Sequence, residues 1–187
     1  MSRLALTPLP IEGAWCVQRQ PLGDARGFLS RVFCADELAA AGWRRPIAQV
    51  NHTLTRACAT VRGLHYQRPP HAEMKLVNCL RGEVWDVVLD LRPCSATYLR
   101  WHAELLSASN FQALLIPEGC AHGFQTLTDD VEMLYLHSAP YVASAEGGLC
   151  PTDPRLGVAW PLPIGEMSER DRSHPLLTDA FQGIDLP

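Results

Sequence analysis

Residues 61–90 read VRGLHYQRPPHAEMKLVNCLRGEVWDVVLD, and this stretch decides the fold. A first apolar run at 61–67 is followed by two more, at 73–77 and 83–90, which are separated by Arg81-Gly82. Runs rich in β-branched and apolar residues predict strands, and a glycine turn between two such runs predicts that they pair. A histidine, a lysine and arginines stand at the edges of these runs. Because histidine titrates near neutrality and cationic side chains bind anions, we look for chemistry here first.

The pattern of short apolar runs and turn residues continues on both sides of this stretch. One short helix is expected at 36–42, where acidic residues precede alanines and a glycine ends the run. Many short strands at close spacing are typical of a β-barrel or jelly roll. We therefore predict an all-β fold, a jelly-roll barrel or sandwich with a few short helices, forming one domain over residues 1–187. Extended segments are expected at 11–20, 28–33, 49–54, 98–105, 112–116, 120–127 and 131–137, with an irregular tail from Tyr141.

Composition narrows the classes of function. The net charge of −4 provides no electrostatic footprint for nucleic acid, and the apolar runs are far too short to span a membrane. Pro8 interrupts the first residues before a signal-peptide core forms, so we expect a cytoplasmic protein. The seven cysteines are an odd number without a Cys-x-x-Cys pair. We therefore expect reduced, mostly buried thiols rather than a disulfide framework or a zinc knuckle.

Three side chains could take part in acid–base chemistry, either by transferring a proton or by pairing with an anion. A base such as His65 benefits from a carboxylate that fixes its tautomer, and Asp171 is a distant candidate for that partner. Strand alternation places Tyr135 on a mostly apolar face, where a tyrosine is ordinarily part of the core. Lys75 would be costly inside a barrel unless it meets an anion, and otherwise it faces solvent. From the residues alone, a purely structural role remains the alternative for each.

Several motifs occur in a fixed order along the chain. They are DARGF (24–28), QVNH (49–52), RGLHYQ (62–67), KLV (75–77), RGEVWDV (81–87), IPEGCAHGF (116–124), Tyr135, Asp153-Pro154 and SERD (168–171). Any one motif alone would be weak evidence, but the ordered set is specific. Together, from about residue 24 to 171, they resemble the dTDP-4-dehydrorhamnose 3,5-epimerase family, a group of cupin-type jelly rolls.

The resemblance implies an epimerase of a nucleotide-linked 4-keto-6-deoxy sugar that needs no cofactor. The C4 ketone acidifies the hydrogens on C3 and C5. By resemblance, His65 is the base, held by Asp171, and Lys75 stabilises the developing enolate oxygen. Tyr135 then returns a proton to the opposite face of the ring, which inverts the centre.

The resemblance also implies how the substrate, a nucleotide-diphosphate sugar, is bound. Arg26 and Arg62 would grip the diphosphate, since the guanidinium group suits phosphate oxygens. A homodimer is implied as well, with residues 26–33 as the candidate segment for exchange between subunits. The remaining substrate-binding positions are Phe28, Gln49, Asn51, His122 and Tyr141.

Some positions depart from the family pattern and keep alternatives open. Ser30-Arg31, Leu136-His137-Ser138, Pro140 and Pro151 stand where other residues are usual. These departures leave the acid–base set intact, but they leave open the nucleotide base, the sugar and whether one centre or two are inverted. The alternatives are therefore a single-centre epimerase or ketoisomerase, or a catalytically silent sugar-nucleotide binder.

A metal-dependent cupin is a further alternative. Its ligands would be His65, His71, Glu73 and His122. Metal-binding cupins often hold their ion with two histidines one residue apart, a glutamate shortly after and a later histidine. The close histidine pair is missing here, so we predict no metal site.

Overall fold

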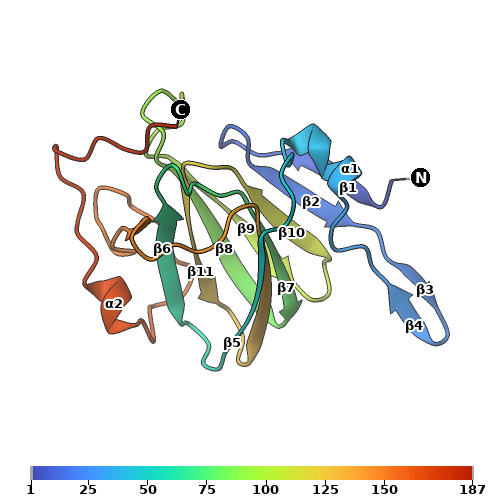
Figure 1. Cartoon of the computed structure of the whole chain (residues 1–187). Helices are drawn as coiled ribbons and strands as arrows, with labels where there is room; N and C mark the ends of the chain where they lie inside the picture. The colour runs from blue at the N-terminus through green and yellow to red at the C-terminus, as the bar shows by residue number, and fades with distance from the viewer. Residues whose placement is uncertain (1, 187) are drawn as a thin grey trace.

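The structure, a computed structural model, describes residues 2–186. Two antiparallel sheets face each other, and the few helices are short, which confirms the predicted all-β class (Figure 1). No helix in the described part of the chain is long and apolar enough to cross a membrane. The elements are β1 (Leu4–Pro8), β2 (Trp15–Arg19), β3 (Leu22–Asp24), β4 (Gly27–Leu29), α1 (Ala35–Leu38), the 3-10 turn η1 (Ala39–Ala41), β5 (Gln49–Thr55), β6 (Val61–Gln67), β7 (Lys75–Arg81), β8 (Glu83–Asp90), β9 (Trp101–Ser107), β10 (Gln112–Ile116), β11 (Cys120–Thr126), β12 (Val131–His137), β13 (Glu146–Gly148) and α2 (Glu169–Arg172).

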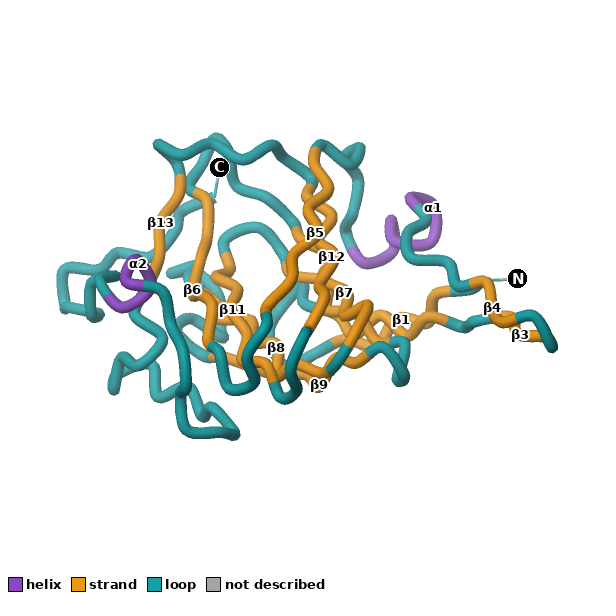
Figure 2. The backbone as a smooth tube through the Cα atoms, turned by 90° about the horizontal axis from the view of Figure 1, so that it is seen from below, coloured by secondary structure: helices purple, strands orange, loops and turns teal. Residues whose placement is uncertain are grey.

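The two large sheets form the jelly roll. One has six strands in the order β1-β2-β10-β7-β12-β5, and the other has five in the order β13-β6-β11-β8-β9. Seen from below, their strands run around a barrel-shaped section, with β5 and β6 on opposing sides (Figure 2). Inward-facing residues of both sheets, among them Val77, Phe124 and Met133, make the shared core. Facing sheets that bury alternate residues in this way are typical of a sandwich.

The predicted pairing of the two runs around Arg81-Gly82 is wrong. Strand β7 lies between β10 and β12 in one sheet, whereas β8 lies between β11 and β9 in the other. Gly82 adopts a positive φ of 76°, and this turn carries the chain from one sheet to the other. A side chain there would collide with Thr128 and Val131. The glycine therefore marks a reversal, but both strands find their partners elsewhere.

Strand β8 buries residues on both of its faces because both are covered. Its inner face packs in the shared core, and its outer residues Val87 and Leu89 pack under the C-terminal segment, including Leu156 and Leu177. The tail is irregular, as predicted, apart from β13 and α2. The other sheet is covered on its outer face by the α1 region, where Leu38 and Trp43 are buried.

Element bounds follow the sequence pattern closely in the middle of the chain. The segments predicted at 112–116 and 131–137 coincide with β10 and β12, and the expected helix is α1 with η1, ended by Gly42 at φ 92°. The segment predicted at 28–33 is shorter, because β4 ends at Leu29. With β3 it makes a small two-stranded hairpin that projects from the body of the molecule (Figure 1).

Candidate active site

A cavity of about 790 Å³ lies between the two sheets. Strands β5, β7 and β12 of one sheet and β6 and β11 of the other contribute to its wall, together with residues 166–172 of the tail. Such a volume suits a small-molecule site. Apart from those of the β3–β4 hairpin, the polar and titratable side chains described below belong to this wall or contact its residues.

His65 and Asp171 lie together although they are 106 residues apart in the sequence. The Nε2 atom of His65, on β6, lies 2.7 Å from Oδ1 of Asp171. Ser168 precedes α2 and its hydroxyl accepts from the backbone N–H of Asp171, which caps the short helix, while the Asp171 carboxylate joins it to β6. Because a carboxylate only accepts, Nε2 carries the proton and Nδ1 is the nitrogen free to take one.

The charge of Asp171 is maintained by its neighbours. Its side chain is almost completely buried, which alone would raise the pKa, but the hydrogen bond and charge of His65 and the Ser168 bond lower the pKa overall. An ionised carboxylate at this position is suited to stabilise an imidazolium at His65.

Tyr135 lies on β12, in the sheet opposite His65. It is buried, and this burial raises the pKa of its phenol, so the hydroxyl keeps its proton at neutral pH. Its ring stands edge-on to that of His122, with the centroids 6.0 Å apart. A proton acceptor on one sheet and a proton donor on the other therefore border the same cavity.

Lys75 points into the barrel rather than to solvent. It is 8% exposed, and its Nζ lies 3.3 Å from Oε1 of Glu73. The other oxygen of Glu73 is 2.8 Å from Nδ1 of His137. Burial alone would raise the pKa of Glu73, but the hydrogen bond from His137 and the charge of Lys75 lower it overall. The buried ammonium group of Lys75 is therefore paired with a carboxylate, which offsets the cost of burying its charge.

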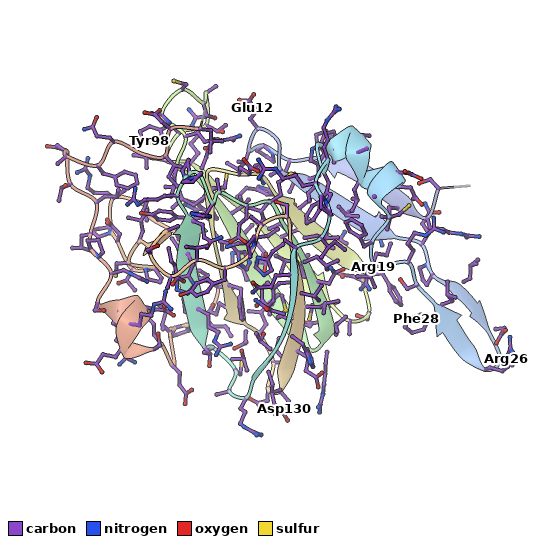
Figure 3. All side chains as sticks on the ribbon, viewed as in Figure 1. Glu12, Arg19, Arg26, Phe28, Tyr98 and Asp130 are labelled. Carbon is purple, nitrogen blue, oxygen red and sulfur yellow. The ribbon has the colours of Figure 1, made fainter. Side chains whose placement is uncertain are left out.

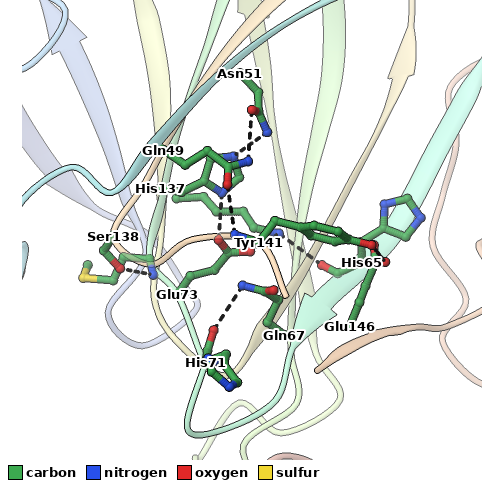
Figure 4. Close-up of polar contacts among 12 residues, drawn as sticks. Gln49, Asn51, His65, Gln67, His71, Glu73, His137, Ser138, Tyr141 and Glu146 are labelled. Carbon is green, nitrogen blue, oxygen red and sulfur yellow. Dashed lines mark hydrogen bonds and ion pairs between the residues drawn. The ribbon is translucent and has the colours of Figure 1, made fainter. Parts of the chain in front are cut away.

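The network continues from His137 to Asn51 and Gln49 (Figure 4). Asn51 Nδ2 lies 3.4 Å from His137 Nε2, and Asn51 Oδ1 accepts from Gln49 Nε2 at 3.0 Å. Gln49 in turn accepts from the backbone N–H of Tyr141 at 2.9 Å. The structure thus brings Gln49, Asn51 and Tyr141 together as one connected group.

His122 forms a second histidine–carboxylate pair. Its Nε2 lies 3.0 Å from both carboxylate oxygens of Asp86, which is fully buried. Burial raises the pKa of Asp86 despite the charge of His122. His122 on β11 is the cross-strand neighbour of His65 on β6, so the two histidines share one end of the cavity.

Cationic side chains from distant segments also line the cavity. Arg62, which the resemblance implies as a diphosphate ligand, is among them, and sequence reasoning did not identify the other three, Arg56, Arg170 and Arg172. Arg170 and Arg172 flank Asp171 in the sequence, and this position next to a candidate catalytic residue was the signal that could have identified them. Arg170 also binds Glu146 at 2.5 Å, and the hydroxyl of Tyr141 donates to the same carboxylate at 2.7 Å.

Arg26 and Phe28 do not reach the cavity of their own chain. They lie on the projecting β3–β4 hairpin (Figure 3), where the Arg26 side chain is 89% exposed and pairs with Asp24. Phe28 packs edge-on against Phe111, and neither residue belongs to the cavity wall. Their predicted contact with substrate is therefore not made within one chain, because the hairpin points away from the barrel.

The four ligands of the metal-dependent alternative do not converge. No three of His65, His71, Glu73 and His122 bring ligand atoms together in the part of the chain described, residues 2–186. Glu73 is engaged by Lys75 and His137, and His122 by Asp86. His71 joins the polar network through its backbone carbonyl, which accepts from Gln67 (Figure 4).

A jelly roll whose facing sheets carry a histidine–carboxylate pair and a buried tyrosine defines a cupin-type acid–base enzyme. The family model described as dTDP-4-dehydrorhamnose 3,5-epimerase matches residues 8–179. The chain belongs to this family, whose members are isomerases.

Relatives in the family act at two centres or at one. The chain is 39% identical to a dTDP-4-dehydrorhamnose 3,5-epimerase of Streptomyces griseus, over 91% of this chain and 85% of the relative. It is 36% identical to a dTDP-4-dehydrorhamnose 3-epimerase of Streptomyces niveus, over 98% of this chain and 89% of that relative.

Solved structures agree with this assignment. An epimerase from Legionella pneumophila, in complex with dTDP-4-keto-L-rhamnose, matches with a TM-score of 0.91 at 30% identity, over 98% of this chain and 99% of that one. A 3'-monoepimerase from Streptomyces bikiniensis, in complex with dTDP-quinovose, matches with a TM-score of 0.84 at 35% identity, over 90% of this chain and 86% of that one.

Proposed function

We propose that the protein epimerises a dTDP-linked 4-keto-6-deoxy sugar at C3 and C5, as a dTDP-4-dehydro-6-deoxyglucose 3,5-epimerase does. The observation that carries the proposal is the placement of His65 and Tyr135 on opposite sheets around one cavity. Inversion of a carbon next to a ketone requires that a proton leave one face of the ring and that another arrive at the other face. Two sheets that enclose the sugar supply one group for each face.

The proposed steps balance with the chain's own groups. Nδ1 of His65 takes the proton from the carbon beside the C4 ketone, and the electron pair of the broken C–H bond moves into the enolate, whose charge rests on O4. The ammonium group of Lys75 stabilises that oxygen. The phenol of Tyr135 gives its proton to the carbon from the other face. Exchange with solvent then removes the proton from His65 and restores it to Tyr135.

The nucleotide diphosphate is proposed to bind at the arginine-rich part of the wall. Arg62 lies at the start of β6, and Arg56, Arg170 and Arg172 line the same cavity. Guanidinium groups bind phosphate oxygens with two parallel hydrogen bonds. A few local cations suffice for one diphosphate, so the net charge of −4 does not oppose binding.

We also propose that the protein is a homodimer in which the β3–β4 hairpin reaches the partner's site. The hairpin exposes Leu22, Phe28 and Leu29, by 50, 64 and 68% respectively. Large apolar side chains gathered on a projecting hairpin suit burial against another surface. Arg26 and Phe28 would then contact the substrate of the partner subunit. Light scattering of the wild type and of Phe28→Ser/Leu29→Ser tests this, and a monomeric wild type would contradict it.

The cytoplasm remains the expected compartment. All seven cysteines are free thiols in the structure. Free thiols persist in a reducing compartment.

The decisive experiment is proton–deuterium exchange. The protein is incubated with dTDP-4-keto-6-deoxyglucose in heavy water, and C3 and C5 are followed by mass spectrometry and NMR. Deuterium at both carbons with inversion is the expected result. Label at one carbon only would replace the proposal by a single-centre epimerase, which the 3-epimerase relatives make the second candidate.

Variants separate an enzyme from a silent binder of sugar nucleotides. His65→Ala is expected to abolish turnover while binding of dTDP, measured by calorimetry, survives. Full activity in His65→Ala would refute the mechanism. Binding of dTDP without exchange at either carbon in the wild type would favour the silent binder.

A further inference from the structure

A third polar side chain lies beside the His65–Asp171 pair and is not used by the proposed mechanism. His174 follows α2, and its ring stands edge-on to that of His65, with the centroids 5.6 Å apart. Its Nε2 is buried and has no hydrogen-bond partner within the described residues. The ring lies against Gly148, where any side chain would collide with it. A buried ring nitrogen without a partner requires an explanation.

The three side chains offer a set of ligand atoms suited to a divalent cation. One ring nitrogen from each histidine and a carboxylate oxygen of Asp171 all lie within 4.8 Å of one another. Oδ1 of Asp171 is 2.7 Å from Nε2 of His65 and 3.9 Å from Nε2 of His174. In a tetrahedral zinc site with bonds of about 2.0–2.2 Å, neighbouring ligand atoms are about 3.3 Å apart. The two observed separations bracket that value, so a small movement of the carboxylate makes them equal.

The remaining coordination position is accessible. The His65 side chain is 30% exposed and belongs to the cavity wall, so water can occupy a fourth position from that side. Two imidazoles and one carboxylate are donors that zinc accepts readily, and a three-ligand set with an open position is a known zinc arrangement. Among the described residues this is the only group of three such side chains that comes together.

We propose that His65, Asp171 and His174 form a binding site for Zn²⁺, and that the bound ion inhibits the enzyme. The ion would take the place of the proton that His65 and Asp171 share. It would thereby withdraw the Asp171 carboxylate from its partnership with the imidazole. The His174 nitrogen gains in the ion the partner that the protein does not provide. Zinc would thus be an inhibitor at this site, whereas the proposed reaction proceeds with the side chains alone.

Metal binding is tested first without substrate. Protein purified without a histidine tag is freed of metal by chelation and titrated with ZnCl₂ by calorimetry, and with Co²⁺ by visible absorption. One ion per chain is expected, and His174→Ala is expected to weaken binding by about tenfold or more. His102→Ala is the matched control, because His102 also pairs with a carboxylate, Glu104, at 2.7 Å, but without a third ligand. Equal affinities of the two variants, or no saturable site in the wild type, would overturn the proposal.

Inhibition is tested separately, and only this half rests on the proposed function. Each protein is assayed with its own metal-free rate as the reference. Zinc is expected to inhibit the wild type and His102→Ala, with recovery on addition of EDTA, while His174→Ala stays active at the same zinc concentration. Saturable zinc binding without loss of activity would overturn the inhibitory role. If no sugar nucleotide is turned over, the calorimetric result still decides whether the site exists.

Discussion

Replacing Lys75 by methionine separates its two expected effects, on stability and on catalysis. The side chain stays unbranched, becomes one atom shorter and loses its charge. Glu73 is then left as a buried carboxylate whose remaining partner is His137, at 2.8 Å. The enolate oxygen of the substrate loses the ammonium group proposed to stabilise it.

The size of the stability effect follows from the geometry. Removing one member of a buried ion pair costs about 3–5 kcal/mol, because the other charge stays buried. Since His137 still donates to Glu73, we expect about 3 kcal/mol. For a domain of this size, 1 kcal/mol corresponds to about 2–4 °C in Tm, so the melting temperature should fall by about 6–12 °C. Loss of a charge that stabilises an oxyanion should lower kcat by about 10²–10³-fold.

A second substitution distinguishes the two effects. Glu73→Gln removes the charge that Lys75→Met leaves behind, and its amide oxygen still accepts from His137. The double variant should therefore recover most of the lost melting temperature without recovering kcat. Circular dichroism melts and a coupled assay of epimerisation provide the two measurements. Recovery of kcat together with stability would refute the catalytic role of Lys75, and an unchanged Tm in Lys75→Met would refute the importance of the pair.

Three further predictions concern other parts of the chain. Tyr135→Phe should lower kcat by about 10²–10⁴-fold. NMR should still show deuterium entering with retention of configuration, because His65 can return a proton to the face of the ring that it came from. Incorporation of deuterium with inversion at the normal rate would contradict this. Asp86→Asn should change the free energy of unfolding by less than about 1 kcal/mol, because burial already disfavours the charged form of Asp86. A larger loss of stability in thermal melts would mean that its pair with His122 is ionic. Asp90→Asn should make stability fall less steeply toward acid pH. Burial alone would raise the pKa of Asp90, but hydrogen bonds from Arg92, Ser95 and Thr97 lower it overall. The stabilisation by Asp90 is therefore present above about pH 4 and is lost as the pH falls. Melts at about pH 3 and pH 7 that show the same acid sensitivity in both proteins would contradict this last prediction.

The strands could be predicted because their signal is local. Residues 112–116 and 131–137 alternate or run apolar between clear turn residues, and they form strands with those bounds. Partner choice is not local, which is why the pairing across Gly82 was predicted wrongly. The turn reverses the chain in either case, and only packing of the whole sandwich determines that β7 and β8 enter different sheets.

The site could be predicted only in part for a similar reason. His65, Tyr135 and Lys75 lie on strands whose alternation can be read from the sequence. The contact with Asp171 is made by a short helix in an irregular tail, 106 residues away, and no pattern fixes where such a tail returns. The same tail supplies Arg170 and Arg172, which the sequence did not reveal as parts of the cavity.

One of the departures after Tyr135 is linked to the charge at Lys75, and the departures leave His65 and Tyr135 themselves unchanged. His137, one of the divergent residues, binds the glutamate that holds Lys75. Removal of a proton from C3 or from C5 places the developing charge on the same oxygen, O4, so a change in the charges around Lys75 alters the stability of both enolates together. The ratio of products has a different origin. In the proposed mechanism each carbon must lie between Nδ1 of His65 and the phenol of Tyr135 in turn, so the number of centres inverted depends on how the sugar is seated between the sheets. Contacts that hold the nucleotide and the ring, rather than the network of Lys75, must therefore distinguish a 3,5-epimerase from a 3-epimerase on this fold.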